Sequence, residues 1–168
     1  IILSAGNDTV IGNLTVGYWN LFNSPEDPRY PDEWYDGVQS GVTNASVSVN
    51  ISQGTVTKKI EGGAHDGTYT DTILGVSGIV GSEGADIFNV TTNAPVMTAD
   101  GEVGWVHGLI GSDLIEDLGS GYAELIGGHG DDVIISGNYV DVVYGDFESN
   151  YYQVEGHDTF AVYGSGYT

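Results

Sequence analysis

The chain has 168 residues, no cysteine and a formal net charge of -21, because 24 Asp and Glu stand against only 3 Lys and Arg. This composition excludes disulfides, thiolate metal sites and cysteine nucleophiles, and it makes nucleic acid an unsuitable partner, since phosphate binding needs a basic surface. No run of about 18 apolar residues occurs, so we expect no membrane span. A compact chain with this much like charge repels itself unless it binds cations, and hard, oxygen-ligated cations suit its carboxylates.

The first predicted element lies within residues 3–11, LSAGNDTVI, where a glycine turn with Gly6 and Asp8 precedes a short strand. We assign residues 1–12 to one row of a parallel β-structure, which a preceding unit could extend. Residues 13–42 form the second predicted element, an irregular loop, because three prolines interrupt the segment SPEDPRYPDEWYD.

Two interpretations of the aromatic side chains in this loop stay open. They could form a platform on which sugar rings stack, with acidic side chains for the hydroxyl groups. They could instead cap the open end of the structure or contact a neighbouring subunit, which is the interpretation we favour. The aromatic residues of this segment are Tyr18, Trp19, Phe22, Tyr30, Trp34 and Tyr35, and the candidate contact residues among them are Trp19, Trp34 and Tyr35.

The third predicted element is a β-hairpin from Ala45 to Glu61, because Val47, Val49 and Ile51 alternate with polar residues before a Gln-Gly turn. We expect this hairpin to lie against the rest of the structure. Sequons for N-glycosylation are also frequent in this half of the chain, and the best-placed sites are Asn13, Asn44 and Asn50.

The remainder of the chain contains a nonapeptide repeat. Residues 127–135, GGHGDDVII, match the pattern G-G-x-G-x-D-x-U-x, in which U is a large apolar residue. Residues 81–89, GSEGADIFN, match it with serine for one glycine. Weaker copies lie at residues 108–116, 136–144 and 153–161. Residues 118–144 hold three rows in unbroken nine-residue phase, although the first row has Ala123 in place of Asp.

Each half of the repeat has a physical reason. The glycine half is a tight turn whose backbone carbonyls point inward, and the Asp adds a carboxylate at the same edge. The x-U-x half is a short strand whose U side chain faces the interior. The inward-facing residues predicted in this way are Val10, Phe88, Ile115, Val133, Val143 and Phe160.

Consecutive copies of the repeat should stack as parallel strands, so that carboxylates from neighbouring rows share one ion. We therefore expect several Ca²⁺ ions, because calcium prefers carboxylate and carbonyl oxygens. The predicted calcium-binding residues are Gly6, Asp8, Gly81, Gly84, Asp86, Gly111, Asp113, Gly127, Gly128, Gly130, Asp132, Gly137, Asp141, Gly156 and Asp158.

These repeats resemble the RTX, or hemolysin-type calcium-binding, repeat family. The stretch from Val47 to Phe88 is similar to the segment that often introduces such repeats, with Asp71 and Asp86 at the separation found in the family. The resemblance implies a β-roll and secretion, and it adds Asp71 to the calcium ligands. It implies no activity, because the same module accompanies proteases, lipases, toxins, epimerases and adhesins.

The predicted fold class is all-β, a parallel β-roll or β-solenoid of nonapeptide repeats with an irregular aromatic loop and a β-hairpin insertion. Residues 1–12 form one row, residues 13–64 the loop and hairpin, and residues 65–168 the calcium-binding roll. We predict no enzyme, because no G-x-S-x-G, H-E-x-x-H or phosphate-loop motif occurs. His129 and His157 occupy variable positions of repeat turns, where solvated side chains are expected.

The predicted function is that of an extracellular structural repeat, ordered by calcium after export and stacked end to end in a filament, surface layer or adhesin. Joining residue 168 to residue 1 of a second copy continues the nine-residue phase, as a tandem repeat or a head-to-tail polymer would. Two alternatives stay open: a carbohydrate-binding module, and an export or folding module of a larger secreted enzyme.

Overall fold

The computed structural model describes residues 1–3, 5–18, 21, 42–90, 104–119, 123–137, 142–146 and 156–162. Over these residues the protein is all-β apart from one turn of 3-10 helix at Ile51–Gln53, so the expected all-β class is confirmed. They include no helix long and apolar enough to cross a membrane. The predicted contact residues Trp19, Trp34 and Tyr35 and the predicted ligand Asp141 lie outside the described residues.

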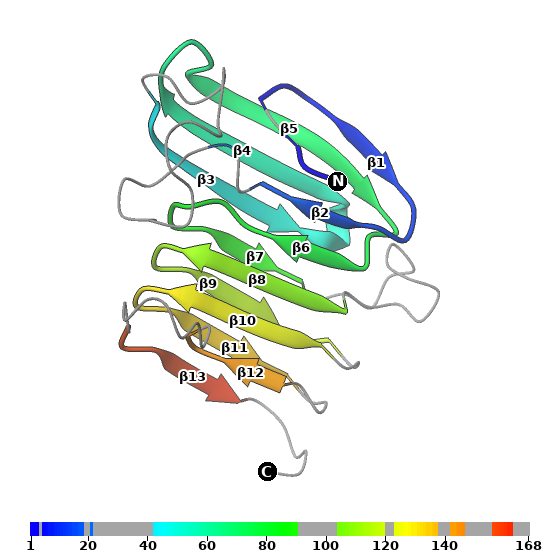
Figure 1. The fold of residues 1–168 in the computed structure, drawn as a ribbon. Coiled ribbons are helices and arrows are strands. Elements are labelled where there is room, and N and C mark those ends of the chain that lie inside the picture. The colour runs from blue at the N-terminus through cyan, green and yellow to red at the C-terminus, as the bar shows by residue number, and fades with distance from the viewer. Residues whose placement is uncertain are drawn as a thin grey trace.

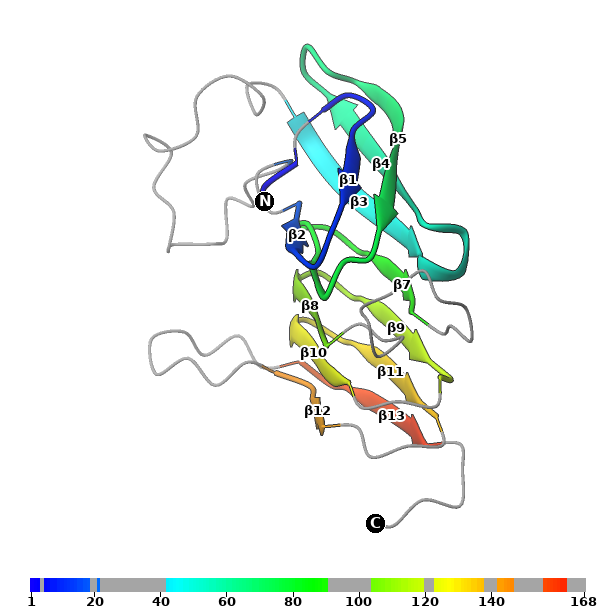
Figure 2. The same cartoon turned by 90° about the vertical axis from the view of Figure 1, so that its right-hand side faces the viewer.

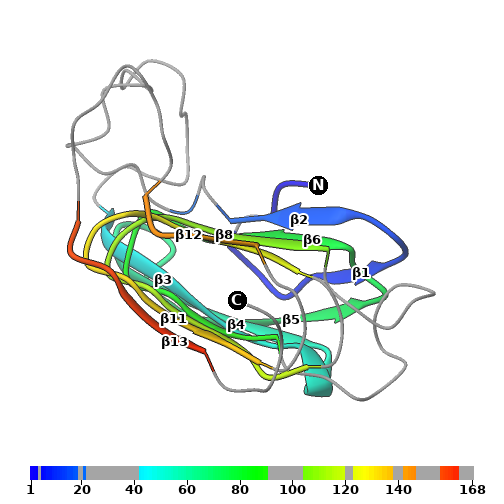
Figure 3. The ribbon, with the colours of Figure 1, turned by 90° about the horizontal axis from the view of Figure 1, so that it is seen from below.

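The strands form two sheets that face each other as two layers (Figure 3). The larger sheet has eight strands, in the spatial order β1 (Thr9–Ile11), β5 (Gly67–Leu74), β4 (Thr55–Gly62), β3 (Val42–Asn50), β7 (Ile87–Asn89), β9 (Leu114–Asp117), β11 (Val133–Ser136) and β13 (Thr159–Val162). The smaller sheet has five strands, in the order β12 (Val142–Tyr144), β10 (Glu124–His129), β8 (Trp105–Ile110), β6 (Gly78–Val80) and β2 (Thr15–Gly17).

From β6 to β13 the chain passes back and forth between the two sheets. Strands β7, β9, β11 and β13 therefore pair in parallel in one sheet, and β6, β8, β10 and β12 in the other. Figure 1 shows the result as a stack of rows that ends at β12 and β13. Equivalent residues of successive rows lie in register: Phe88 opposite Ile115, Ile115 opposite Ile134, and Ile134 opposite Phe160.

The strands begin where the nonapeptide pattern places them. Strands β1, β7, β9, β11, β12 and β13 each start at the seventh position of a predicted copy. One predicted orientation is wrong: Val133 is 38% exposed, whereas Ile134 is 1% exposed and faces the core. Side chains alternate along a strand, so the residue two positions after the buried Asp132 must face inward, and that residue is Ile134. Phe160 occupies the inward position but is 51% exposed, because β13 is the last described strand of its sheet.

The predicted hairpin is present as antiparallel strands β3 and β4. Its turn is closed by Asn50, whose Oδ1 accepts hydrogen bonds from Gln53 N and Ser52 Oγ, and by Gly54 in the left-handed region at φ 66°. We expected the hairpin to lie against the rest of the structure. It is instead inserted into the larger sheet, between β5 and β7 (Figure 2). Because β3 pairs in parallel with β7, the edge of the hairpin extends the rows that follow.

The predicted aromatic loop begins later than residue 13, because Thr15–Gly17 form β2 and pair in parallel with β6. Val16 of β2 starts a column of buried side chains on the inner face of the smaller sheet, followed by Ile79, Val106 and Leu125 in register. This column faces the buried apolar residues of the larger sheet. The column of the smaller sheet and the column of Phe88, Ile115 and Ile134 in the larger sheet together form a continuous core. This core holds the turns between the sheets one above another.

Candidate metal centre

Four aspartates line one edge of the stack, where the chain turns from the smaller sheet into the larger one. They are Asp86, Asp113, Asp132 and Asp158, and we call them the aspartate ladder. Asp86 N–H donates to Asp113 Oδ1 at 2.8 Å, Asp113 N–H donates to Asp132 Oδ1 at 2.8 Å, and Asp132 N–H donates to Asp158 Oδ1 at 3.1 Å. The ladder thus brings together predicted ligands that are far apart in the sequence.

The ladder carboxylates differ in how fully they are hydrogen-bonded. At the upper end, both oxygens of Asp86 have donors: Oδ1 accepts from Val47 N at 2.6 Å and from Ser82 Oγ at 2.8 Å, and Oδ2 accepts from Ser82 N at 2.6 Å. In the next two rows, Asp113 Oδ2 and Asp132 Oδ2 are buried and have no hydrogen-bond partner. A buried carboxylate oxygen without a partner is costly, so these two positions call for a proton or a cation.

The glycines at the first position of each turn show where these oxygens point. A methyl group on Gly108 would overlap both Asp113 Oδ2 and the carbonyl oxygen of Gly127. A methyl group on Gly127 would overlap Asp132 Oδ2 and lie 2.8 Å from the carbonyl oxygen of Gly145. Each unpartnered carboxylate oxygen therefore faces the same point as a carbonyl oxygen of the following row. The Gly145 carbonyl oxygen accepts from the Gly128 N–H at 2.7 Å, but the two carboxylate oxygens have no donor. A carboxylate oxygen that faces a carbonyl oxygen is suited to a cation or to a protonated carboxyl group.

The ionisation of the ladder agrees with this geometry. Burial raises the pKa of Asp86 to about 7, and burial together with the charges of Asp86 and Asp132 raises the pKa of Asp113 to about 9. Burial, with smaller contributions from Asp158 and other nearby carboxylates, raises the pKa of Asp132 to about 6. Without a cation, Asp113 therefore retains its proton at neutral pH, and Asp86 does so in part.

A second column of glycines brings backbone carbonyl oxygens into the same turns. A methyl group on Gly111 would lie 2.6 Å from the carbonyl oxygen of Gly84. A methyl group on Gly130 would overlap the carbonyl oxygen of Gly111, and a methyl group on Gly156 would overlap the carbonyl oxygen of Gly130. Gly111 and Gly130 also have φ values of 134° and 132°, which favour glycine. The turns therefore stack backbone on backbone, with carbonyl oxygens directed at the next row.

Not all predicted ligands join the ladder. Gly6, at φ 117°, leads into Asp8, and Asp8 lies with Asp71 on the far side of the hairpin from Asp86. Gly137 lies at the opposite edge, between β11 and β12, where a methyl group would come within 2.8 Å of Leu118 Cα. The predicted set is therefore divided between the ladder, the Asp8–Asp71 pair and the opposite edge.

Of the other predicted glycines, Gly81 packs against Asp86 Oδ2, which a methyl group there would overlap, and Gly128 has φ 117° in the second position of its turn. Its neighbour in the adjacent row is Leu109, which keeps a positive φ of 88° although it is not glycine. A methyl group on Gly128 would overlap the Leu109 carbonyl oxygen, so Gly128 is needed both for its φ and for its size.

Sequence reasoning missed several participants. Gly108 and Gly145 pack against the carboxylates of Asp113 and Asp158, and Ser82 donates to Asp86. Gly108 could have been identified from the sequence, because it occupies the first position of the predicted copy at residues 108–116. Gly145 gave none, because it lies 13 residues before Asp158 instead of the usual five.

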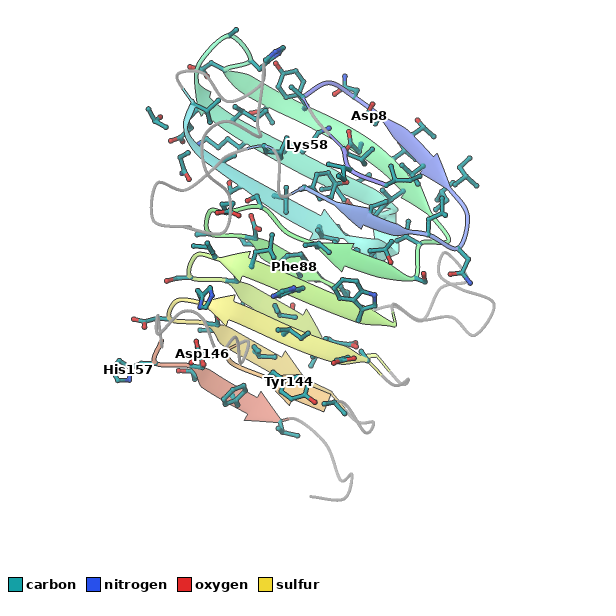
Figure 4. The ribbon with its side chains drawn as sticks, viewed as in Figure 1. Asp8, Lys58, Phe88, Tyr144, Asp146 and His157 are labelled. Atoms are coloured by element: carbon teal, nitrogen blue, oxygen red, sulfur yellow. The ribbon has the colours of Figure 1, made fainter. Side chains whose placement is uncertain are left out.

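Lys58 of β4 is the fourth missed participant, and its signal was the alternation with Val56 and Ile60, which places it on the inward face. Asp8 and Lys58 lie toward one end of the stack and His157 toward the other (Figure 4). His157 is exposed as expected, but His129 is buried at the end of β10, so its predicted solvation is wrong.

Of the predicted glycosylation sites, Asn13 and Asn44 are exposed, whereas the side chain of Asn50 closes the hairpin turn. Over the described ranges, no three His, Cys, Asp or Glu side chains come together as a metal-binding cluster. A cation in the ladder would therefore need backbone carbonyl oxygens in addition to carboxylates. Models of protein families, curated proteins and solved structures were all compared with this chain, and none matches it.

Proposed function

We propose that this protein is a calcium-binding, RTX-type β-roll segment that acts outside the cell as a structural repeat. The observation that carries the proposal is the pair of buried, unpartnered carboxylate oxygens, Asp113 Oδ2 and Asp132 Oδ2. Each faces a carbonyl oxygen of the following row, those of Gly127 and Gly145. A β-roll is supported by the alternation of strands between two parallel-paired sheets from β6 to β13.

Calcium fits this donor set because it binds carboxylate and carbonyl oxygens, and six to eight of them in flexible geometry. Asp113 and Asp132 would hold the ions together with the carbonyl oxygens of the stacked turns. When bound, calcium supplies positive charge in place of the protons that the ladder otherwise retains. Binding should therefore order the rows and release protons, and low calcium inside a cell would leave them disordered until export.

The test is a titration of the chain from chelator into millimolar calcium, followed by circular dichroism and by isothermal titration calorimetry. We expect a gain of β-structure with calcium, and no equal gain with magnesium or with sodium chloride of matched ionic strength. The variant Asp132→Asn should lose part of the calcium response. Asp66→Asn is the matched control, because Asp66 is an exposed turn residue away from the ladder. Full folding in chelator with no bound calcium would refute the proposal.

We further propose that copies of the chain stack end to end. Among the described residues, the larger sheet ends at β1 and β13 and the smaller at β2 and β12. Apolar side chains are exposed at both ends: Ile1, Ile2, Ile11 and Leu14 at the first, and Tyr144, Phe160 and Val162 at the second.

The direction of the ladder hydrogen bonds supports a head-to-tail contact. The backbone N–H groups of Asp8, Asp86, Asp113 and Asp132 each donate to the Asp carboxylate of the row below. A second copy with its β1 beside β13 would offer the Asp8 carboxylate to the N–H of Asp158. Such a contact does not close on itself and would propagate into a filament.

Analytical ultracentrifugation in calcium tests this contact. We expect assemblies that grow with protein concentration, and we expect Val162→Lys to abolish them, because a charge on an edge strand opposes strand pairing. Ile87→Lys is the control, because it adds the same charge at an exposed apolar residue in the middle of the stack, and it should leave the assemblies intact. A chain that stays monomeric when folded with calcium would refute stacking while leaving the calcium site standing.

A further inference from the structure

Lys58 is a buried basic residue in an acidic interior. It lies in β4 between Val56 and Ile60, and because side chains alternate along a strand, it shares their inward face. Its side chain is 0% exposed, and its Nζ lies 2.8 Å from Asp71 Oδ1 and 3.2 Å from Asp8 Oδ2. Asp71 is also 0% exposed. A buried ammonium is costly unless it is paired, so the two carboxylates account for its position.

The two carboxylates that Lys58 contacts repeat the geometry of the ladder. Asp8 N–H donates to Asp71 Oδ1 at 2.8 Å, which matches the bond from Asp86 N to Asp113 Oδ1 at 2.8 Å. Asp8 and Asp71 each precede the buried apolar residue of their strand by two positions, as Asp86, Asp113 and Asp132 do. Strands β1 and β5 therefore form a step equivalent to a ladder step, separated from the ladder by the hairpin.

The Asp8–Asp71 step differs from the ladder in having a positive charge of its own. Asp71 Oδ2 at this step, like Asp113 Oδ2 and Asp132 Oδ2 in the ladder, is buried without a hydrogen-bond partner among the described residues. At the Asp8–Asp71 step, the ammonium group contacts a carboxylate from each of the two rows. The ring of Tyr18, which follows β2, closes the other side, with its centroid 5.9 Å from Nζ, a distance at which an aromatic face attracts a cation.

We propose that Lys58 Nζ takes the place of a bound calcium ion at the Asp8–Asp71 step, so that the buried Asp71 carboxylate has a positive counter-charge without metal. This inference rests on the proposed calcium-binding function of the ladder. The hairpin carries Lys58 on β4 and pairs through β3 with β7, the first strand of the ladder rows. It therefore joins a metal-independent step to the metal-dependent rows, and its β3 edge is a preformed template on which those rows order.

The test is to remove the ammonium group and count calcium ions. Lys58→Met keeps much of the side-chain length and leaves two uncompensated carboxylates beside Tyr18. We expect Lys58→Met to be destabilised in chelator, to regain its fold in millimolar calcium, and to bind one more calcium ion per chain than the unmodified protein. Lys59→Met is the matched control, because Lys59 is exposed and pairs with Glu61, and it should leave the number of ions unchanged.

A double variant, Lys58→Met with Asp71→Asn, separates charge from packing. It should fold in chelator as the unmodified chain does and gain no ion, because one carboxylate has been removed together with the ammonium. If Lys58→Met stays unfolded in calcium, or folds and binds the same number of ions as the unmodified chain, the inference about Lys58 is overturned. If neither chain binds calcium, the proposed function of the ladder itself fails.

Discussion

Replacing Asp113 with Asn should have opposite effects on the metal-free and the calcium-bound protein. Asn keeps Oδ1 as the acceptor for Asp86 N and places an NH₂ group where Oδ2 faces the carbonyl oxygen of Gly127. The substitution thus turns a pair of facing acceptors into a donor and an acceptor. It should stabilise the chain in chelator and weaken its response to calcium.

The size of the effect follows from the pKa of Asp113, which burial raises to about 9 from 3.8. At about pH 8 an unfolded Asp is ionised, and keeping it protonated in the folded state costs about 1.4 kcal/mol for each of roughly four pH units, or up to about 6 kcal/mol. Asn has no such cost. Since mutational effects rarely reach such a limit, we expect Asp113→Asn to gain about 2 kcal/mol in chelator.

Urea denaturation at about pH 8, in chelator and in millimolar calcium, measures both effects in one experiment. The matched control is Asp66→Asn, the same chemical change at an exposed residue, which should shift neither curve appreciably. Loss of stability in chelator for Asp113→Asn would show that the carboxylate is satisfied without a cation or proton. An unchanged calcium response would show that Asp113 is not a ligand.

Three further predictions concern the ladder and its turns. The pKa values of Asp86, Asp113 and Asp132 in the folded protein are raised, to about 7, 9 and 6. The stabilisation that their protonation gives the fold is therefore complete below about pH 4 and is lost as the pH rises through those values. Thermal melts in chelator should show higher stability near pH 5 than near pH 8, and the opposite order would contradict the assignment. Gly127→Ala should cost about 3 kcal/mol in urea denaturation with or without calcium, because its methyl group would overlap Asp132 Oδ2, and a cost below about 1 kcal/mol would contradict the stacking of the turns. Leu109→Gly should gain about 1 kcal/mol in the same assay, because Leu109 has a φ of 88° that glycine adopts without strain, and a clear loss would mean that its side-chain contacts outweigh the strain.

The repeat rows were predictable from the sequence because the chemistry of each turn is local. A glycine, then an Asp, then an apolar residue at fixed spacing determines where each strand begins, and β7, β9 and β11 begin there. The error at Val133 came from the same region. Val133, Ile134 and Ile135 are all apolar, so hydrophobicity alone does not show which one faces inward, whereas counting from Asp132 does.

The position of the hairpin was not predictable, because it depends on pairing between distant segments. Alternation and a turn signal predict β3 and β4 as a hairpin. They do not predict that β3 pairs with β7, where Val49 lies opposite Phe88, 39 residues further along the chain. Lys58 was missed for a related reason. Lys is almost never fully buried unless it is paired, and its partners Asp8 and Asp71 lie in other strands.

Burial along the stack would link the proposed calcium binding to the proposed end-to-end assembly. Asp113 and Asp132 have a row above and below and are almost completely buried, whereas Asp158 in the last described row is partly exposed. Water can solvate the Asp158 carboxylate in an isolated chain, so the need for a cation there is weaker than at the middle rows. A second copy stacked on β13 would bury Asp158 and place the Asp8 carboxylate next to it. The joint between copies would then need a cation of its own, so that calcium favours assembly and assembly strengthens calcium binding by the same factor.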